Sequence, residues 1–306
     1  MDKQDSLVSI GMPTKDRGHL IRRALDSLLS QTYKNFELII SDNGSSDDTQ
    51  KICEVYALKD SRIRYFRQTE NIGVGSAHNF DFVRRQARGK YFMWATDDDW
   101  WDPKFIETLK NILDKNPDFD LAMSSFDRGG EYVFSGDKNL TLFDGVELFF
   151  HIFSVTPKNK SNMAIYGLFR REFIQKFFRR AQIPLPPYLK PERVLIAEMA
   201  LCAKFYTIPD ILFKKFLPEN RVIRSSRFKG YSAAVVARIL AFVLTSPNVS
   251  LARKLKVLAR FHKLPHHRGN FIRFTAAVFA YVIFYIFSEI IAHYSPAAFS
   301  KELPRA

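Results

Sequence analysis

Residues 7–49 read LVSIGMPTKDRGHLIRRALDSLLSQTYKNFELIISDNGSSDDT. Two short apolar runs, at 7–11 and 36–41, flank a segment in which apolar residues recur at helical spacing over 18–30. Short apolar runs that end in turn residues are typical of buried strands, so this order predicts a strand, a helix and a second strand. Because consecutive strands joined by a helix usually lie parallel, the stretch indicates an α/β fold.

The same alternation continues to about residue 125. Further strands are expected at 62–67, 91–95 and 119–124, and further helices at 47–57, 75–85 and 102–114. We therefore expect a Rossmann-like, mainly parallel sheet with helices on both faces. The later pattern is looser, and it predicts helices at 144–151, 171–180, 192–203 and in three segments after 221.

Charge is distributed unevenly along the 306 residues. The chain holds 46 Lys and Arg against 32 Asp and Glu, a net charge of +14. Residues 221–273 hold twelve Lys or Arg and no acidic residue, whereas residues 1–220 hold 32 basic and 30 acidic residues. We therefore expect a nearly neutral domain over 1–215 and a helical, basic C-terminal region over 216–306.

Composition limits the class of protein. Apolar residues make up 46% and charged residues 25% of the chain, which excludes a disordered or fibrous protein. The two cysteines are far apart, which disfavours a disulfide scaffold and fits a reducing compartment. The N-terminus has no apolar stretch of signal-peptide length.

One late stretch is a membrane candidate. Residues 274–288, FTAAVFAYVIFYIFS, carry no charge but are shorter than the roughly 20 residues of a spanning helix. Basic residues precede the stretch, and anionic headgroups attract such residues. The pattern favours a helix in the membrane interface at the cytoplasmic side. A short span over 274–294 and an oligomer helix are the alternatives.

Polar residues follow four of the expected strands. In an open parallel sheet, ligands bind beyond the carboxyl ends of the strands, so these residues should share one rim. The rim segments are residues 13–17, 42–47, 70–75 and 96–99. No P-loop or dinucleotide-binding glycine pattern occurs there, which disfavours those two kinds of site.

Three adjacent carboxylates, Asp97, Asp98 and Asp99, end the strand expected at 91–95. They repel one another unless a cation or a proton compensates, and a hard divalent cation prefers oxygen ligands. The alternative is a solvated acidic turn before the next helix. All three Trp of the chain lie within 94–101, where they either wall a site or pack in the core.

The stretch 8–49 and the stretch 70–103, ENIGVGSAHNFDFVRRQARGKYFMWATDDDWWDP, together resemble the family 2 glycosyltransferases. The resemblance covers about residues 6–125 strongly and continues weakly to about 215. It implies a GT-A fold. It also implies inverting transfer of a sugar from a nucleotide-diphosphate sugar to an acceptor hydroxyl, with a divalent metal, Mn²⁺ or Mg²⁺.

The resemblance also implies roles for single residues. Asp98 takes the place of the metal-binding Asp of the family's DxD motif, and Asp99 is a second metal candidate. Thr96 stands where the first Asp would be. Asp42 matches the family's base-contacting Asp. The residues expected to bind the nucleotide sugar are Pro13, Thr14, Asp16, Asp42, Ser45, Asn71, Gly73, Asn79 and Asp97.

Inverting transfer needs a base that removes the proton of the acceptor hydroxyl. In the family this base is an acid near the start of a late helix. Glu192 aligns best with it, and Glu198 is the second choice. Glu192 also reads as an ordinary first-turn acid, and Glu198 as an exposed helix residue.

The expected acceptor is a glycan, or a lipid-linked glycan in polysaccharide biosynthesis, met by a peripheral enzyme at the inner face of the plasma membrane. Oligomers could form through the C-terminal helices, and no nucleic acid is expected. Three other interpretations stay open: a nucleic-acid-binding protein that uses 221–273, a nucleotidyltransferase, and an inactive relative that acts as a scaffold.

Overall fold

The computed structural model describes residues 6–68, 77–127, 133–134, 166–180, 198–216, 243–244, 246 and 249–260. The strands are β1 (Val8–Thr14), β2 (Phe36–Asp42), β3 (Ile63–Arg67), β4 (Tyr91–Trp94), β5 (Trp100–Trp101), β6 (Leu121–Asp127), β7 (Val133–Phe134), β8 (Leu168–Arg170) and β9 (Phe205–Lys214). The helices are α1 (Ile21–Leu29), α2 (Thr49–Lys59), α3 (Ala77–Gln86), α4 (Phe105–Lys115), α6 (Arg171–Arg180) and α9 (Leu251–Arg260).

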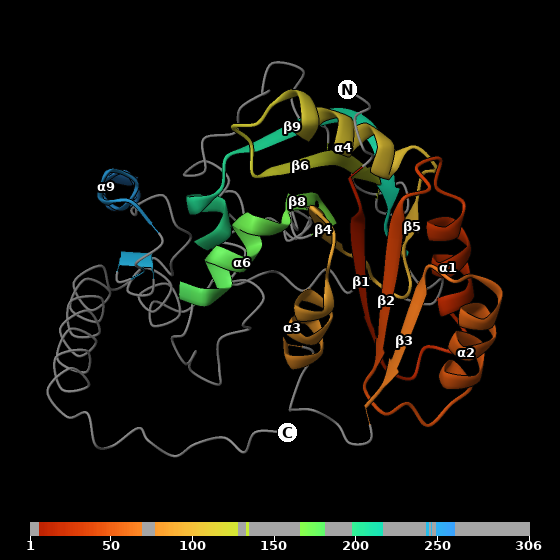
Figure 1. The fold of residues 1–306 in the computed structure, drawn as a ribbon. Coiled ribbons are helices and arrows are strands. Elements are labelled where there is room, and N and C mark those ends of the chain that lie inside the picture. Colours follow the sequence, from red (N-terminus) through yellow and green to blue (C-terminus); the bar gives the residue numbers. More distant parts are fainter. Residues whose placement is uncertain are drawn as a thin grey trace, which may run out of the picture.

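The strands form one nine-stranded mixed sheet in the order β3-β2-β1-β4-β8-β6-β9-β5, with β7 paired to β6 beside this path (Figure 1). Strands β3, β2, β1 and β4 are parallel, as the alternating pattern predicts. The antiparallel strand β8 joins this half to β6, and β9 runs parallel to β6. The expected α/β sheet is confirmed, with its parallel part in the N-terminal half.

Helices cover both faces of the parallel half. Figure 1 shows α1 and α2 on one side of β1, β2 and β3, and α3 on the other. Every residue of β1 and of β2 is buried. Strands covered on both faces lose the usual alternation of apolar and polar residues, which explains their continuous apolar runs.

The sequence did not predict strands β5, β7, β8 and β9. Strand β5 has only two residues, which is too short for any periodic pattern. Strand β9 contains Pro209, its residues 209–211 are exposed, and its register with β6 shifts near Ser124 and Ser125. The strand conformation at this edge therefore depends more on pairing with neighbouring strands than on the local residue pattern.

Several predictions fall outside the described residues. These are the helix at 144–151, most of the helix at 192–203, and the stretch 274–294. Of the three helical segments predicted after residue 221, the one over LARKLKVLARFH (251–262) is confirmed over residues 251–260, where it forms α9. In the part of the chain that the structure describes, no helix is long and apolar enough to cross a membrane. The domain boundary near residue 215 stays a prediction.

Both cysteines are free. Cys53 is buried in α2, and Cys202 is half-buried just before β9. Burial raises the pKa of each thiol to about 12, and nearby carboxylates such as Asp42 and Glu198 add to the effect. Neither side chain is a thiolate near neutral pH.

A buried carboxylate ties the three parallel strands β1, β2 and β3 together. Glu37 of β2 is 7% exposed. It accepts hydrogen bonds from Ser9 Oγ (2.6 Å), Arg64 Nη1 (2.8 Å) and the N–H of Arg88 (2.8 Å). Burial by itself would raise the pKa of Glu37, but these donors outweigh it and hold the pKa below its usual range.

We predict that Glu37→Gln lowers the free energy of unfolding by about 1–3 kcal/mol, because three donors lose a charged acceptor. The carboxylate contributes stability above the ordinary glutamate pKa of about 4.3, and this contribution is lost as the pH falls through the lowered folded-state pKa. Urea unfolding between pH 7 and pH 3 should show this loss in the wild type and a flatter profile in the variant. Glu54→Gln on the exposed side of α2 is the control, and equal effects of the two substitutions would contradict the assignment.

Candidate functional site

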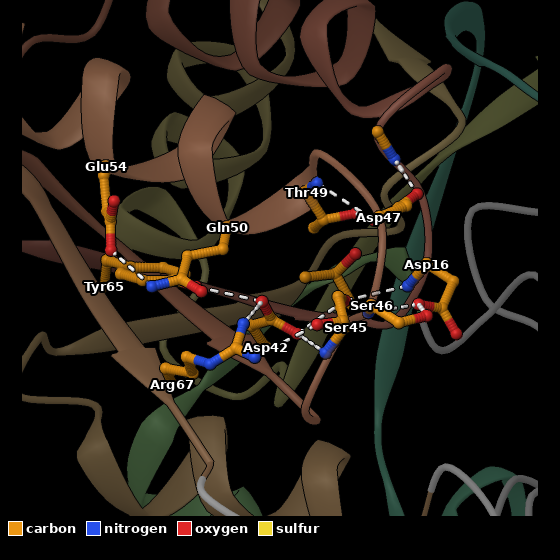
Figure 2. A network of polar contacts seen from close by, with 12 residues as sticks. Asp16, Asp42, Ser45, Ser46, Asp47, Thr49, Gln50, Glu54, Tyr65 and Arg67 are labelled. Carbon is orange, nitrogen blue, oxygen red and sulfur yellow. Dashed lines mark hydrogen bonds and ion pairs between the residues drawn. The ribbon is translucent and has the colours of Figure 1, made fainter.

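Asp42, at the carboxyl end of β2, is fully buried and accepts four hydrogen bonds or ion-pair contacts (Figure 2). Oδ1 accepts from the N–H of Ser45 (2.8 Å) and from its Oγ (2.6 Å). Oδ2 accepts from Tyr65 Oη (2.9 Å) and lies 3.5 Å from Arg67 Nη1. Both oxygens are therefore engaged within the protein, and a ligand N–H would have to displace Tyr65 or Arg67.

The loops after β1 and β2 are joined by hydrogen bonds. The N–H of Asp16 donates to Ser45 Oγ (2.9 Å), and Asp16 Oδ1 accepts from the N–H (2.8 Å) and the Oγ (3.1 Å) of Ser46. Asp16 has a φ of 51°, in the left-handed region that Asp tolerates better than most residues. Figure 2 shows Asp16 facing the second loop.

Helix α2 reinforces this junction at its first turn. The N–H of Arg17 donates to Thr49 Oγ1 (2.8 Å), and the N–H of Gly18 donates to Asp47 Oδ2 (2.9 Å). Asp47 also accepts from the N–H of Thr49 (2.9 Å). The two loops thus form one fixed surface at the carboxyl ends of β1 and β2.

Of the remaining residues expected to bind nucleotide sugar, Pro13, Thr14 and Asn79 are buried parts of the frame. Asn79 Nδ2 donates to the carbonyl of Ser41 (2.9 Å) and, more weakly, to that of Thr14 (3.4 Å). Asn79 therefore bridges the ends of β1 and β2. Asn71 and Gly73 lie outside the described residues.

The three adjacent aspartates are held in three different ways. Asp97 Oδ1 lies 3.4 Å from Arg17 Nε. The backbone carbonyl of Asp98 accepts a hydrogen bond from Arg23 of α1. Asp99 is fully buried and lies 2.9 Å from Lys215 Nζ. Within the described part of the chain, no donor contacts the Asp98 carboxylate, and this side chain is half-buried.

Burial raises the pKa of Asp97 to about 6, because the carboxylate loses water. The neighbouring Asp98 charge raises it further, while Arg17 opposes the shift. Burial likewise raises the pKa of Asp99, against the attraction of Lys215. The loop therefore holds more negative charge than its surroundings fully compensate, which is an environment that favours a bound cation.

The donor set fits a divalent cation that is shared with a ligand. Carboxylate oxygens suit Mg²⁺ and Mn²⁺. Among the described residues, no three Asp, Glu, His or Cys side chains converge on one point. Mg²⁺ is commonly held by one or two carboxylates together with substrate phosphates, so the loop matches a cation that arrives with a diphosphate.

Glu198 lies away from the aspartate loop. It is 1% exposed and accepts a hydrogen bond from Ser246 Oγ. One helical turn later, Cys202 lines a cavity of about 420 Å³ with Asp120, which precedes β6 at the opposite end of the strands. The exposed position expected for Glu198 is wrong, because Glu198 is buried and contacts Ser246. Glu192 lies outside the described residues.

Four basic or aromatic groups of the rim were not singled out from the sequence: Tyr65, Arg67, Arg23 and Lys215. Tyr65 and Arg67 belong to β3, and alternation along a strand places both on one face, which could have linked them to Asp42. Arg23 and Lys215 carry no comparable local pattern, since Lys215 lies 116 residues from Asp99.

The model of Glycosyl transferase family 2 matches residues 9–178, more than half of the chain. A curated relative, the putative colanic acid biosynthesis glycosyl transferase WcaA of Escherichia coli K12, is 40% identical over 135 residues. That match covers 44% of this chain and 46% of WcaA. The chain spans less than half of the length of the curated relatives it matches.

Two solved structures share the fold. S. aureus TarS 1–349 in complex with UDP-GlcNAc aligns with a TM-score of 0.61 and 16% identity, over 83% of this chain and 71% of TarS. The mannosyltransferase PcManGT from Pyrobaculum calidifontis, in complex with GDP-Man and Mn²⁺, aligns with a TM-score of 0.54 and 15% identity. This alignment covers 96% of this chain and 82% of PcManGT.

Proposed function

The chain belongs to glycosyl transferase family 2, and from this premise we propose that it transfers a sugar, with inversion, from a nucleotide-diphosphate sugar to an acceptor hydroxyl. The observation that carries the proposal is the rim described above. Two fixed loops lie beside the aspartate loop, and among the described residues only the Asp98 carboxylate of that loop has no donor in contact with it. Family membership favours this reaction over the nucleic-acid-binding and nucleotidyltransferase alternatives.

The donor would lie along the carboxyl ends of the parallel strands, as ligands of open α/β sheets do. The loops around Asp16 and Ser45 would support the nucleotide, and Asp42 would fix the position of Arg67 and Tyr65 beneath it. Binding of UDP-GlcNAc by TarS and of GDP-Man by PcManGT supports a nucleotide sugar as the donor class.

Asp98 is the proposed metal ligand, and Asp97 lies beside it with its charge partly balanced by Arg17. Asp99 is the weaker metal candidate, because its oxygens already accept bonds from Lys215 and from the N–H of Phe216. When bound, Mn²⁺ or Mg²⁺ would neutralise charge on the leaving diphosphate. The Mn²⁺ in the PcManGT complex supports a divalent metal as the class of cofactor.

We predict that Asp98→Asn lowers metal-dependent turnover about 100-fold or more, because the carboxylate that would hold the cation loses its charge. The assay measures release of the nucleoside diphosphate from UDP-, GDP- and dTDP-sugars with Mn²⁺ or Mg²⁺. Asp118→Asn, at an exposed turn after α4, is the matched control. Unchanged turnover in Asp98→Asn would remove the metal assignment, and no turnover of any donor by the wild type would remove the proposed function.

A catalytic base must reach the acceptor hydroxyl, and the burial of Glu198 makes it a poor candidate. We therefore keep Glu192 as the proposed base and assign Glu198 to holding Ser246 against its helix.

We predict that Glu192→Gln lowers kcat about 100-fold or more and leaves donor affinity nearly unchanged, because general-base assistance is lost while the donor site is intact. Glu198→Gln should mainly lower the melting temperature. Initial rates and donor Kd, measured for both variants, separate the two roles. If Glu198→Gln alone loses kcat without loss of stability, the base is misassigned.

We also propose that the enzyme acts as a peripheral protein at the cytoplasmic face of the membrane, on a glycan or lipid-linked acceptor of polysaccharide biosynthesis. Helix α9 supports this. Val257 packs inward, whereas Leu251 and Leu255 are 72% and 56% exposed on the other side, near the basic residues Lys254 and Lys256. An exposed apolar face beside lysines is complementary to an anionic bilayer.

We predict that Leu251→Glu/Leu255→Glu weakens binding of the full chain to phosphatidylglycerol vesicles about 10-fold or more, because two leucines lose their apolar contact with lipid. Vesicle cosedimentation measures the binding, with phosphatidylcholine vesicles as the uncharged comparison. Leu58→Glu, on an 88% exposed residue of α2, is the matched control. Equal binding by the double variant and the wild type would overturn the membrane proposal.

A further inference from the structure

Asp99 is the most tightly held of the three aspartates. Its side chain is fully buried. Oδ1 accepts from the N–H of Phe216 (2.9 Å), and Oδ2 accepts from Lys215 Nζ (2.9 Å) and from Thr96 Oγ1. A buried carboxylate with donors on both oxygens is a fixed point of the loop rather than an open ligand.

Lys215 reaches Asp99 because of strand pairing. Strands β5 and β9 are antiparallel, with Trp100 opposite Lys214 and Trp101 opposite Phe213. Continuing this register by one residue sets Lys215 opposite Asp99. The N–H of Lys215 also donates to the carbonyl of Asp127 at the end of β6 (2.8 Å). Lys215 is therefore held through its backbone by one strand and through its side chain by the aspartate loop.

Phe216, the residue after Lys215, also connects β9 to the aspartate loop. The guanidinium of Arg23 lies 4.1 Å from the ring centroid of Phe216, and it donates to the carbonyl of Asp98. Helix α1 thus holds the backbone carbonyl of Asp98, and the end of β9 holds the side chain of Asp99. Arg17 holds the Asp97 side chain from a third direction.

We propose that Lys215 is a positioning residue that, by pairing with Asp99, turns the Asp98 carboxylate outward toward the metal and the diphosphate. The inference rests on the proposed role of Asp98. Loss of the ammonium group would leave a buried charge next to two other carboxylates, and the loop would rearrange to relieve the repulsion.

The same geometry gives Thr96 a role. Its hydroxyl donates to the Oδ2 that Lys215 also contacts. A carboxylate at position 96 would face Asp99 with like charge, so the hydroxyl and the lysine form a matched pair of donors around one acceptor. Thr96 is then a second positioning residue of the loop.

The test compares Lys215→Met with Lys204→Met, which removes the same charge from an exposed residue just before the other end of β9. We expect Lys215→Met to raise the Mn²⁺ concentration for half-maximal turnover about 10-fold and Lys204→Met to leave it unchanged. Lys215→Arg should restore most of the loss, because it returns the positive charge.

A second readout does not need turnover. Mn²⁺ alone, and Mn²⁺ with UDP or GDP, should raise the melting temperature of the wild type, and this shift should shrink in Lys215→Met. Thr96→Val should shrink it less, and Thr96→Ser should retain it. These milder variants keep the test valid if Lys215→Met does not fold.

An unchanged Mn²⁺ dependence and an unchanged melting shift in Lys215→Met would overturn the inference, as would an equal loss in Lys204→Met. Failure of the proposed function has a different signature. In that case the wild type turns over no sugar nucleotide, whereas the Mn²⁺-dependent melting shift still reports on the loop.

Discussion

Three carboxylates in one short loop repel one another, and the structure of the aspartate loop depends on protein groups that balance this repulsion. Burial removes the water that would screen Asp97 and Asp99, so their repulsion has to be balanced by protein groups. Arg17 and Lys215 come from segments that lie far apart in the sequence. The fold must therefore be complete before the loop can take its shape, which makes the loop a product of tertiary structure.

At the neighbouring rim, three neutral donors and one guanidinium together balance the charge of Asp42. Asp42 is surrounded by a backbone N–H, a hydroxyl, a phenol and a guanidinium, and the left-handed turn at Asp16 locks this group to the first loop. Such a network has little freedom to adjust when a ligand arrives. The surface is thus preorganised, and affinity for a donor would not be reduced by the cost of ordering these loops.

The N-terminal half of the fold could be predicted because strands β1, β2 and β4 are buried throughout and each connection is a helix. The edge of the sheet could not, since β5 is two residues long and the pairing of β9 with β6 is irregular near Pro209. The directions of the strands predicted which loops meet at the rim. They did not predict which residues of these loops contact one another. Nothing near Asp99 in the sequence indicates its contact with a lysine 116 residues away. Nothing near Glu198 indicates its hydrogen bond with Ser246.

The two protonated thiols have a practical consequence for following this molecule in solution. With pKa values near 12, Cys53 and Cys202 react slowly with maleimides at neutral pH. A cysteine introduced at the exposed position of Leu255 would therefore take up a fluorophore selectively. The natural cysteines would contribute little label. The fluorescence of the attached group would therefore report on the environment of α9 without replacement of either natural cysteine.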